Sequence, residues 1–173
     1  MMIRLAEREL KTKFGNFTEM LYYDGRSESI ALVMGDVANV EDVFCRIHSH
    51  CIGAHIFNSI ECDCREQMAS AQEMIQKEGR GVIIWLDQEG KGNGHLALMQ
   101  SIPFKKAGDA QADAYVKAGF RADARDYRAA AEILSDLKVR SIVLLANGGG
   151  KADELRKDSV NVSGVKALNV QSS

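Results

Sequence analysis

The sequence lacks the marks of membrane, secreted and multidomain proteins. It contains no apolar run near the roughly 18 residues that a membrane-spanning helix needs. The segment Met1–Glu7 carries acidic and basic residues where a signal peptide requires an apolar stretch. A single proline and no low-complexity stretch leave little sign of a linker between domains. We therefore expect one domain over residues 1–173, without a membrane partner.

The sequence also lacks a large excess of charge of either sign. Lys and Arg number 22 against 24 Asp and Glu, so the formal net charge is −2. A chain without an excess of positive charge has no broad field to hold a nucleic-acid polymer. Four cysteines are too few for a disulfide-built scaffold, which favours a reducing, cytoplasmic compartment. We expect the partner to be a small molecule, with any anionic group bound by local charges.

Three of the four cysteines are close together in the sequence. Ten residues separate Cys51 from Cys62, and Cys64 follows two positions later. Thiolates bind Zn²⁺ with tetrahedral geometry, and a site with only three protein ligands keeps its fourth position for water or substrate. This spacing predicts a zinc site of the catalytic kind.

Two other interpretations of these cysteines remain open. A fourth ligand would close the site and make it structural, and the candidates for that ligand are His48, His50 and His55. Alternatively, the cysteines bind no metal. Cys45 is out of step with the other three and is expected to be an ordinary buried thiol.

The first third of the chain has the pattern of β-strands. Phe17–Tyr23 and Ser29–Val37 are rich in β-branched and aromatic residues and flank a turn-like segment at 24–27, which predicts a hairpin. Val43–His48 continues as a strand whose alternation sends Arg46 and His48 to one face. The scaffold thus leads directly into the cysteine segment.

Helices and buried strands alternate after the cysteines. Residues 65–79 have helical spacing, and Gly81–Leu86 is a short apolar run typical of a buried strand. A helix that begins at 96–100 is expected to be interrupted at Pro103. The region 105–119 is rich in Ala, Gly, Asp and Lys, and we expect it to be mobile or only partly ordered.

The last third continues this alternation. We expect a helix over Tyr127–Leu137, a strand over Ser141–Ala146, a short helix through Arg156 and a closing edge strand within Val160–Val170. Asp123 or Asp126 is expected to accept hydrogen bonds at the start of the first of these helices.

Two glycine-rich loops are candidate anion sites. Glu89, Gly90 and Lys91 begin a loop with three glycines in five residues, whose backbone can approach a phosphate or a ribose closely. Lys151 lies where a second glycine-rich turn starts a helix, and free backbone N–H groups there favour an anion. The alternatives are an ordinary strand-to-helix turn for the first loop and a solvated lysine in a flexible turn for the second.

Together, these motifs resemble those of the GTP cyclohydrolase II family. The matching residues follow the family's order and spacing over most of the chain, namely Arg46-x-His48-Ser49-x-Cys51, Glu61-Cys62-Asp63-Cys64, Gln67, Gln88-Glu89-Gly90, Gly119-Phe120-x-Ala122-Asp123-x-Arg125-Asp126-Tyr127 and Asn147. The resemblance implies an α/β fold with a mixed, barrel-like sheet in a single domain. Its N-terminal part would be strand-rich, helices would flank the later strands, and the protein would be a homodimer.

The resemblance also implies a reaction and its residues. Members hold zinc through three cysteines, use a zinc-bound water to open the imidazole ring of GTP with release of formate in riboflavin biosynthesis, and remove pyrophosphate with Mg²⁺ on the triphosphate. The arginine matching Arg125 attacks the α-phosphorus, and the aspartate matching Asp123 is its base. A salt bridge at a helix entry is the alternative for this pair. Positions matching the family's substrate-binding residues are Arg46, His48, Ser49, His50, Gln67, Glu89, Gly90, Lys91, Gln111 and Lys151.

Several positions depart from the family's pattern and bear on the substrate. Lys91 stands where members usually have arginine, so a bidentate phosphate fork becomes a point charge. A lysine, an arginine and a catalytic tyrosine are replaced by Leu98, Gln100 and Ile102. His50 replaces an acidic residue, Gln111 replaces a threonine, and residues 146–149 replace Thr-Asn-Asn-Pro. Losing these cations and hydroxyls predicts weaker triphosphate binding.

Three functions follow as hypotheses. The first is a zinc hydrolase that opens the purine ring of GTP. The second is a divergent relative that opens another nucleotide or nucleoside base, such as UMP or uridine in uracil catabolism, where a homologue resembles this family. The third is a zinc-stabilised nucleotide-binding protein without turnover. Formate release separates purine opening from pyrimidine opening, and any turnover excludes the third hypothesis.

Overall fold

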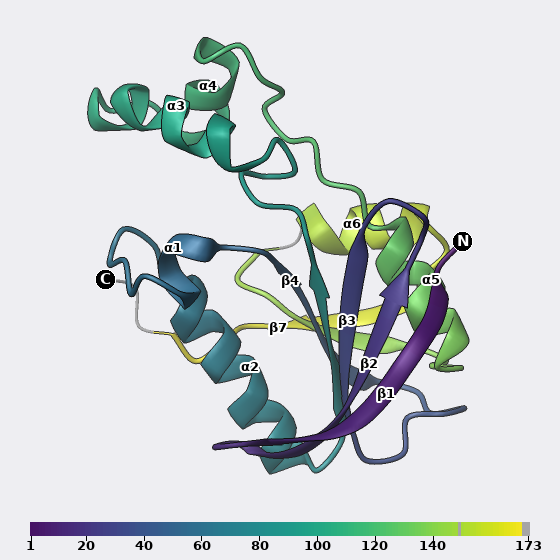
Figure 1. The fold of residues 1–173 in the computed structure, drawn as a ribbon. Helices are drawn as coiled ribbons and strands as arrows, with labels where there is room; N and C mark the ends of the chain where they lie inside the picture. Colours follow the sequence, from purple (N-terminus) through teal and green to yellow (C-terminus); the bar gives the residue numbers. More distant parts are fainter. Residues whose placement is uncertain (149, 171–173) are drawn as a thin grey trace.

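A seven-stranded mixed sheet forms the centre of the protein in the computed structural model, which describes residues 1–148 and 150–170 (Figure 1). The strands are, in spatial order, β1 (Ile3–Thr12), β2 (Gly15–Tyr23), β3 (Glu28–Met34), β5 (Gly81–Leu86), β4 (Val43–Ser49), β6 (Ile142–Leu145) and β7 (Val162–Lys166). The pairs from β1 to β5 are antiparallel, and those from β5 to β7 are parallel. The expected mixed α/β fold is confirmed. Over the described residues the sheet is open, with β1 and β7 as its edges.

The predicted hairpin is confirmed. Strands β2 and β3 pair with Tyr23 opposite Glu28, and β3 ends at Met34, three residues before the predicted end. The sequence pattern does not predict β1, because most of its side chains are exposed on both faces and carry no periodic burial signal. Pairing with β2 along its length, and not an apolar face, makes this segment a strand.

Three parallel strands end at the same edge of the sheet. Strands β4 and β5 pair with Ser49 opposite Leu86, and β6 lies parallel to β4 on its other side. The segments that follow them therefore converge there: the cysteine segment after β4, the glycine-rich loop after β5 and Asn147 after β6. Ligands of open α/β sheets bind outside the carboxyl ends of parallel strands. The topology thus places the candidate site at this edge.

Within residues 1–148 and 150–170, six helices flank the sheet or project from it, namely α1 (Ile52–His55), α2 (Cys64–Glu78), α3 (His95–Lys106), α4 (Gln111–Lys117), α5 (Arg128–Asp136) and α6 (Gly150–Lys157). Helix α2 packs on one face, where Ile75 shares a core with Phe17 and Ile83. Helices α5 and α6 cover the other face, where Ile133 and Leu155 belong to the larger core (Figure 1). No helix of the described residues is long and apolar enough to cross a membrane.

Several predicted element ends are confirmed. Helix α2 ends at Gly79, whose φ of 79° is the left-handed conformation that glycine adopts readily after a helix. Helix α5 begins at Arg128 and its N-cap is Tyr127, so neither Asp123 nor Asp126 is the capping residue that we expected. Asp126 lies one position earlier, and its Oδ1 accepts the backbone N–H of Arg128 at 2.8 Å. Strand β7 is an edge strand, as expected for Val160–Val170.

Two predictions about α3 and α4 are wrong. Helix α3 continues through Pro103 to Lys106, and the region 105–119, expected to be mobile, contains helix α4. The reason is tertiary: the two helices pack on each other and bury Ala97, Ser101, Ala114 and Tyr115. This packing offsets the hydrogen bond that proline removes and the weak helical signal of the segment. The pair projects from the sheet as a helical arm (Figure 1).

Candidate active site

The three clustered cysteines come together in space. Cys51 precedes α1, Cys62 lies in the following loop, and Cys64 is the first residue of α2. Their Sγ atoms all lie within 4.8 Å of one another, and those of Cys51 and Cys62 are 3.6 Å apart. Tetrahedral Zn²⁺ with bonds of about 2.3 Å places two sulfurs about 3.8 Å apart. The cluster therefore fits zinc in donor type and in spacing.

No histidine joins this cluster. Among the described residues, the three cysteines are the only group of three or more candidate ligand side chains. His48 and His55 face each other, with their Nε2 atoms 2.9 Å apart, and His50 Nδ1 contacts Asp87 Oδ1 at 3.0 Å. The arrangement is thus the open, three-ligand one. Cys45 is fully buried in β4 outside the cluster, and burial raises its pKa to about 12.

Electrostatics also favour a cation among these sulfurs. Burial and the neighbouring thiols raise the pKa of Cys64 well above its ordinary value, and burial likewise raises the pKa of Cys51. Three thiolates at this spacing repel one another, whereas a divalent metal deprotonates and neutralises them. Cys64 also lies in the first turn of α2, where the helix dipole favours negative charge.

One cavity, of about 450 Å³, opens on the cysteines from the side of the helical arm. Leu98 and Ile102 of α3 and Tyr115 of α4 give it an apolar wall. Its polar lining includes residues predicted to bind substrate, namely Ser49, His50, Glu89, Gly90, Lys91 and Gln111. A mostly apolar pocket of this size with a few polar groups is typical of a small-molecule site. We call it the arm pocket.

Glu89 braces this pocket. Its side chain is buried, accepts the backbone N–H of Ile52 at 3.1 Å and pairs with His95 Nδ1 at 2.9 Å. It therefore ties the loop after β5 to the start of α1 and to the start of α3. Gln111 lies across the pocket and donates to Ser101 Oγ at 3.3 Å. Tyr115 also lines this pocket, and the sequence did not predict it as a site residue because it lies in the segment 105–119 that we expected to be mobile.

A second cavity, of about 740 Å³, adjoins the cluster and is lined by the cations Arg46, Arg125 and Lys151. The arm pocket also has cations in its lining, namely Lys91, Lys105, Lys106 and Arg125. The predicted residues that line it are Arg46, His48, Ser49, Gln67, Asp123, Arg125 and Lys151. Ser49, Cys64 and Arg125 line both cavities, so the cysteine cluster lies at their junction. We call the second cavity the cationic pocket. Every residue predicted to act in catalysis, substrate binding or metal binding lines one of the two.

Arg46 and Lys151 are held firmly in the cationic pocket. Arg46 is buried and donates to Leu145 O at 3.1 Å and to Gln67 Oε1 at 2.6 Å. Lys151 Nζ donates to Ile47 O at 2.8 Å. Burial and the charges of the nearby arginines lower the pKa of Lys151 to about 7. An anion in this pocket would favour the protonated lysine and offset that cost.

Asp123 and Arg125 form an ion pair. Arg125 Nε donates to both carboxylate oxygens of Asp123, at 2.9 and 3.1 Å, and Nη2 also contacts Oδ2. Burial opposes ionisation of Asp123, but the hydrogen bonds and charge of Arg125 outweigh it and hold the carboxyl pKa below its ordinary value. Hydrogen bonding to Asp123 raises the pKa of Arg125. In this state the pair is a salt bridge, which was the alternative interpretation, and a nucleophilic arginine would have to separate from Asp123.

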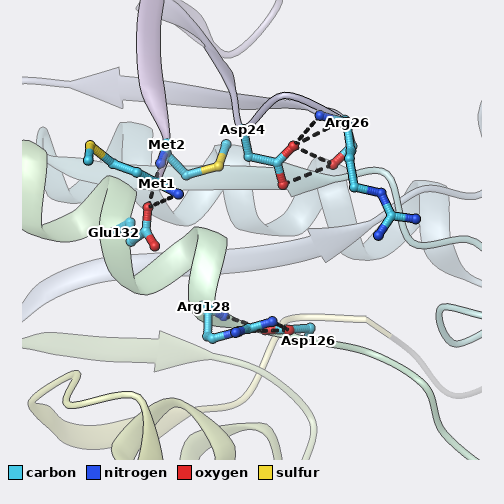
Figure 2. Close-up of polar contacts among 8 residues, drawn as sticks. Met1, Met2, Asp24, Arg26, Asp126, Arg128 and Glu132 are labelled. Carbon is cyan, nitrogen blue, oxygen red and sulfur yellow. Dashed lines mark hydrogen bonds and ion pairs between the residues drawn. The ribbon is translucent and has the colours of Figure 1, made fainter.

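A third cavity, of about 540 Å³, lies beside the N-terminus, and its charged groups are largely paired with one another (Figure 2). Arg128 pairs with Asp126, Asp24 accepts the backbone N–H of Arg26, and the Met1 amino group lies 3.7 Å from Glu132. Gln88 links this side to the site, because its side-chain amide exchanges hydrogen bonds with the backbone of Asp126. The guanidinium of Arg26 makes no ion pair within the described residues, and it is the cation that this cavity leaves available (Figure 2).

Known proteins similar to this chain share one family. The sequence profile of the GTP cyclohydrolase II family matches residues 3–167. A riboflavin biosynthesis protein RibBA of Nocardia farcinica is 41% identical over 153 residues, which cover 86% of this chain and 37% of that protein. A GTP cyclohydrolase-2 of Archaeoglobus fulgidus is 42% identical over 156 residues, which cover 89% of this chain and 41% of that protein. The chain thus spans about two fifths of the length of these relatives.

A solved structure supports the fold. The two-domain 3,4-dihydroxy-2-butanone 4-phosphate synthase RibBX from A. baumannii is similar with a TM-score of 0.50 and 16% identity, over 98% of this chain and 40% of that chain. At this identity the likeness concerns the fold alone. The family profile, by contrast, extends over nearly all of the sheet and over the three cysteines. The chain belongs to the GTP cyclohydrolase II family.

Proposed function

We propose that this protein is a zinc-dependent hydrolase that opens the base ring of a nucleotide, with the imidazole ring of GTP as the first candidate. One observation carries the proposal: the cluster of three cysteines lies where the arm pocket, with its apolar wall, meets the cationic pocket. Zinc held by Cys51, Cys62 and Cys64 would activate water for attack on a ring carbon. Family membership supports the same reaction class.

We propose that the two pockets bind different parts of the nucleotide. We place the base in the arm pocket, between the apolar wall and the polar groups of Ser49, His50 and Gln111. We place the phosphates in the cationic pocket, near Arg46, Arg125 and Lys151. Lys91, which the sequence led us to expect at a phosphate, instead lines the arm pocket. Charge-assisted hydrogen bonds to phosphoryl oxygens are worth roughly 1.5–3 kcal/mol each, so these cations would supply much of the affinity.

Asp123 and Arg125 would serve a second step at phosphorus. Arg125 would exchange its bonds to Asp123 for a covalent bond from a guanidinium nitrogen to the α-phosphorus, while the bond from that phosphorus to the pyrophosphate oxygen breaks and Asp123 takes up the guanidinium proton. Water would then cleave the nitrogen–phosphorus bond and restore Arg125. Pyrophosphate would leave, and Mg²⁺ would accompany a triphosphate substrate. Arg125 lines both pockets, which supports contact with the part of a nucleotide that joins base and phosphates.

A second candidate substrate is a pyrimidine nucleotide or nucleoside, such as UMP or uridine. The observation that favours it is the apolar wall at Leu98 and Ile102, because a purine's polar edge would lie there without partners. An unpaired buried polar group costs about 1–3 kcal/mol. A nucleotide-binding protein without turnover is the remaining alternative.

We also propose that the protein is a cytoplasmic homodimer and that residues 1–173 form one domain. The helical arm supports a dimer, since it exposes Leu96 and Met99 on α3 and Val116 on α4, each more than half exposed. Covering such side chains is favourable by about 25 cal/mol per Å² of apolar area. Three free thiols that must remain ligands support a reducing compartment. Light scattering on the purified protein would test the dimer, and a monomer mass at all concentrations would contradict it.

The function is tested with zinc-loaded protein and a panel of GTP, GMP, guanosine, UMP and uridine. Formate release indicates purine opening, and loss of base absorbance without formate indicates pyrimidine opening. Serine at Cys51, Cys62 or Cys64 should remove zinc and activity together. Cys45→Ala is the matched control, because this thiol lies outside the cluster and should leave zinc content unchanged. Full zinc content in all three serine variants, or no turnover of any compound, would contradict the proposal.

A further inference from the structure

The hydroxyl of Tyr127 has no hydrogen-bond partner although it is buried. In the part of the chain that the structure describes, only two buried side-chain polar atoms lack a partner, Ser49 Oγ and the Tyr127 hydroxyl. Tyr127 as a whole is 5% exposed. Buried hydroxyls in folded proteins are nearly always paired, because an unpaired one costs stability. Both exceptions here line the cationic pocket, which points to a partner outside the chain.

The surroundings of Tyr127 indicate what that partner would be. The Arg125 guanidinium carbon and Lys151 Nζ lie 5.9 and 6.0 Å from the centre of its ring. Arg46 is also close enough to influence the hydroxyl electrostatically, as are the carboxylates of Asp123 and Glu154. Three cations around one cavity disfavour a cationic ligand. Burial raises the pKa of Tyr127, so the hydroxyl keeps its proton and can donate to an anionic oxygen.

We propose that Tyr127 is a substrate-binding residue whose hydroxyl donates a hydrogen bond to a phosphoryl oxygen held by Arg125 and Lys151. This inference rests on the proposed function in that the phosphoryl group belongs to a nucleotide. The hydroxyl is shielded from water, so the phosphoryl group reaches it after a neighbouring side chain shifts. Arg125 is the side chain that would shift, because it exchanges Asp123 for the ligand. In the sequence Tyr127 belongs to a motif shared with the family, but the sequence alone assigns it no part in binding or catalysis.

Tyr22 provides a matched control. It is also fully buried, but its hydroxyl donates to Asp136 Oδ2 at 2.7 Å, and neither residue lines the arm pocket or the cationic pocket. Removing the hydroxyl from Tyr22 breaks an existing hydrogen bond. Removing it from Tyr127 takes away a buried polar group that has no partner, and so removes the cost of burying it. Tyr22→Phe should therefore destabilise the ligand-free protein, whereas Tyr127→Phe should leave its stability unchanged or raise it.

The test measures binding of inorganic pyrophosphate to zinc-loaded protein by calorimetry, and thermal unfolding without ligand. Tyr127→Phe should raise the Kd for pyrophosphate about 10- to 100-fold, as expected for losing one hydrogen bond to a charged group. Its Tm without ligand should stay equal or rise. Tyr22→Phe should lower Tm and leave the Kd unchanged. Binding of guanosine, which has no phosphate, should be the same in wild type and in Tyr127→Phe.

The outcomes separate this inference from the proposed function. If Tyr127→Phe lowers Tm and binds pyrophosphate as wild type does, the residue is only structural and the inference is wrong. It is also wrong if wild-type protein binds no pyrophosphate yet opens a nucleotide base, in which case the proposed function stands. If no nucleotide is turned over but Tyr127→Phe selectively weakens pyrophosphate binding, the inference stands and the proposed function fails.

Discussion

Gly92 offers a way to displace Asp123 and Arg125 without changing either residue. It has a φ of 82°, and a Cβ added there would lie 2.6 Å from Ala124 O and 2.9 Å from Arg125 N. Real Cβ contacts are rarely closer than 3.0–3.4 Å, so the backbone at 124–125 would have to move by about 0.4–0.8 Å. Lys91 O accepts the N–H of Ala124 at 2.8 Å, which fixes the two segments to each other.

Gly92→Ala should therefore lower the rate of the proposed pyrophosphate release strongly and change the zinc content little. A displacement near 1 Å costs up to about 10²-fold in rate, so we expect a loss of about 10- to 100-fold in pyrophosphate release. The left-handed φ adds about 1–2 kcal/mol of destabilisation. Zinc content should stay at the wild-type level, because the cysteines lie on other segments.

The control for this prediction is Gly119→Ala. Gly119 also has a positive φ, of 89°, but a Cβ there would meet nothing within 4 Å. The two variants share the backbone cost and differ in the clash with residues 124–125. Zinc content, Tm and the rates of base opening and pyrophosphate release should be measured for both. Equal rates in Gly92→Ala and Gly119→Ala would refute the reasoning, because the clash would then have no effect on Arg125.

Three further predictions follow from the same site. Arg125→Ala should abolish pyrophosphate release from a triphosphate while some zinc-dependent base opening persists, and equal loss of both rates would contradict separate nucleophiles. Burial lowers the pKa of His48 to about 3, below its unfolded value near 6.5, so folded protein binds fewer protons in that window. Stability should fall by about 1.4 kcal/mol per pH unit below pH 6.5. Urea unfolding of metal-free protein checks this, and His48→Gln should flatten the profile. Ile102→Tyr should raise kcat/KM for GTP relative to UMP by about one to two decades, and an unchanged ratio would place the base elsewhere.

Local patterns in the sequence determined the elements that lead into the site. The apolar run of β5 and the alternation in β4 predict strands because one or both faces of each are buried. The helix after Cys64 and its end at Gly79 follow from spacing and from the conformation of glycine. The compact spacing of Cys51, Cys62 and Cys64 likewise predicts a metal site, since short segments limit how far these sulfurs can separate.

Other features depended on contacts between distant segments. Strand β1 exists by pairing with β2, and α4 exists by packing on α3, so neither has a strong local signal. The position of the histidines outside the cysteine cluster also depends on such contacts. His48 contacts His55, and His50 contacts Asp87. The spacing of residues in the sequence does not predict such a partner, because it does not show which distant side chain will contact a given histidine.

The sequence by itself determined the chemistry available to this protein: three closely spaced cysteines and an aspartate two residues from an arginine. Only the tertiary structure decided how that chemistry is divided between two pockets that share Ser49, Cys64 and Arg125. It also decided that the Tyr127 hydroxyl is buried without a partner. The physical reason is that burial and hydrogen bonding are properties of the packed chain, because each depends on which distant atoms come within a few ångströms.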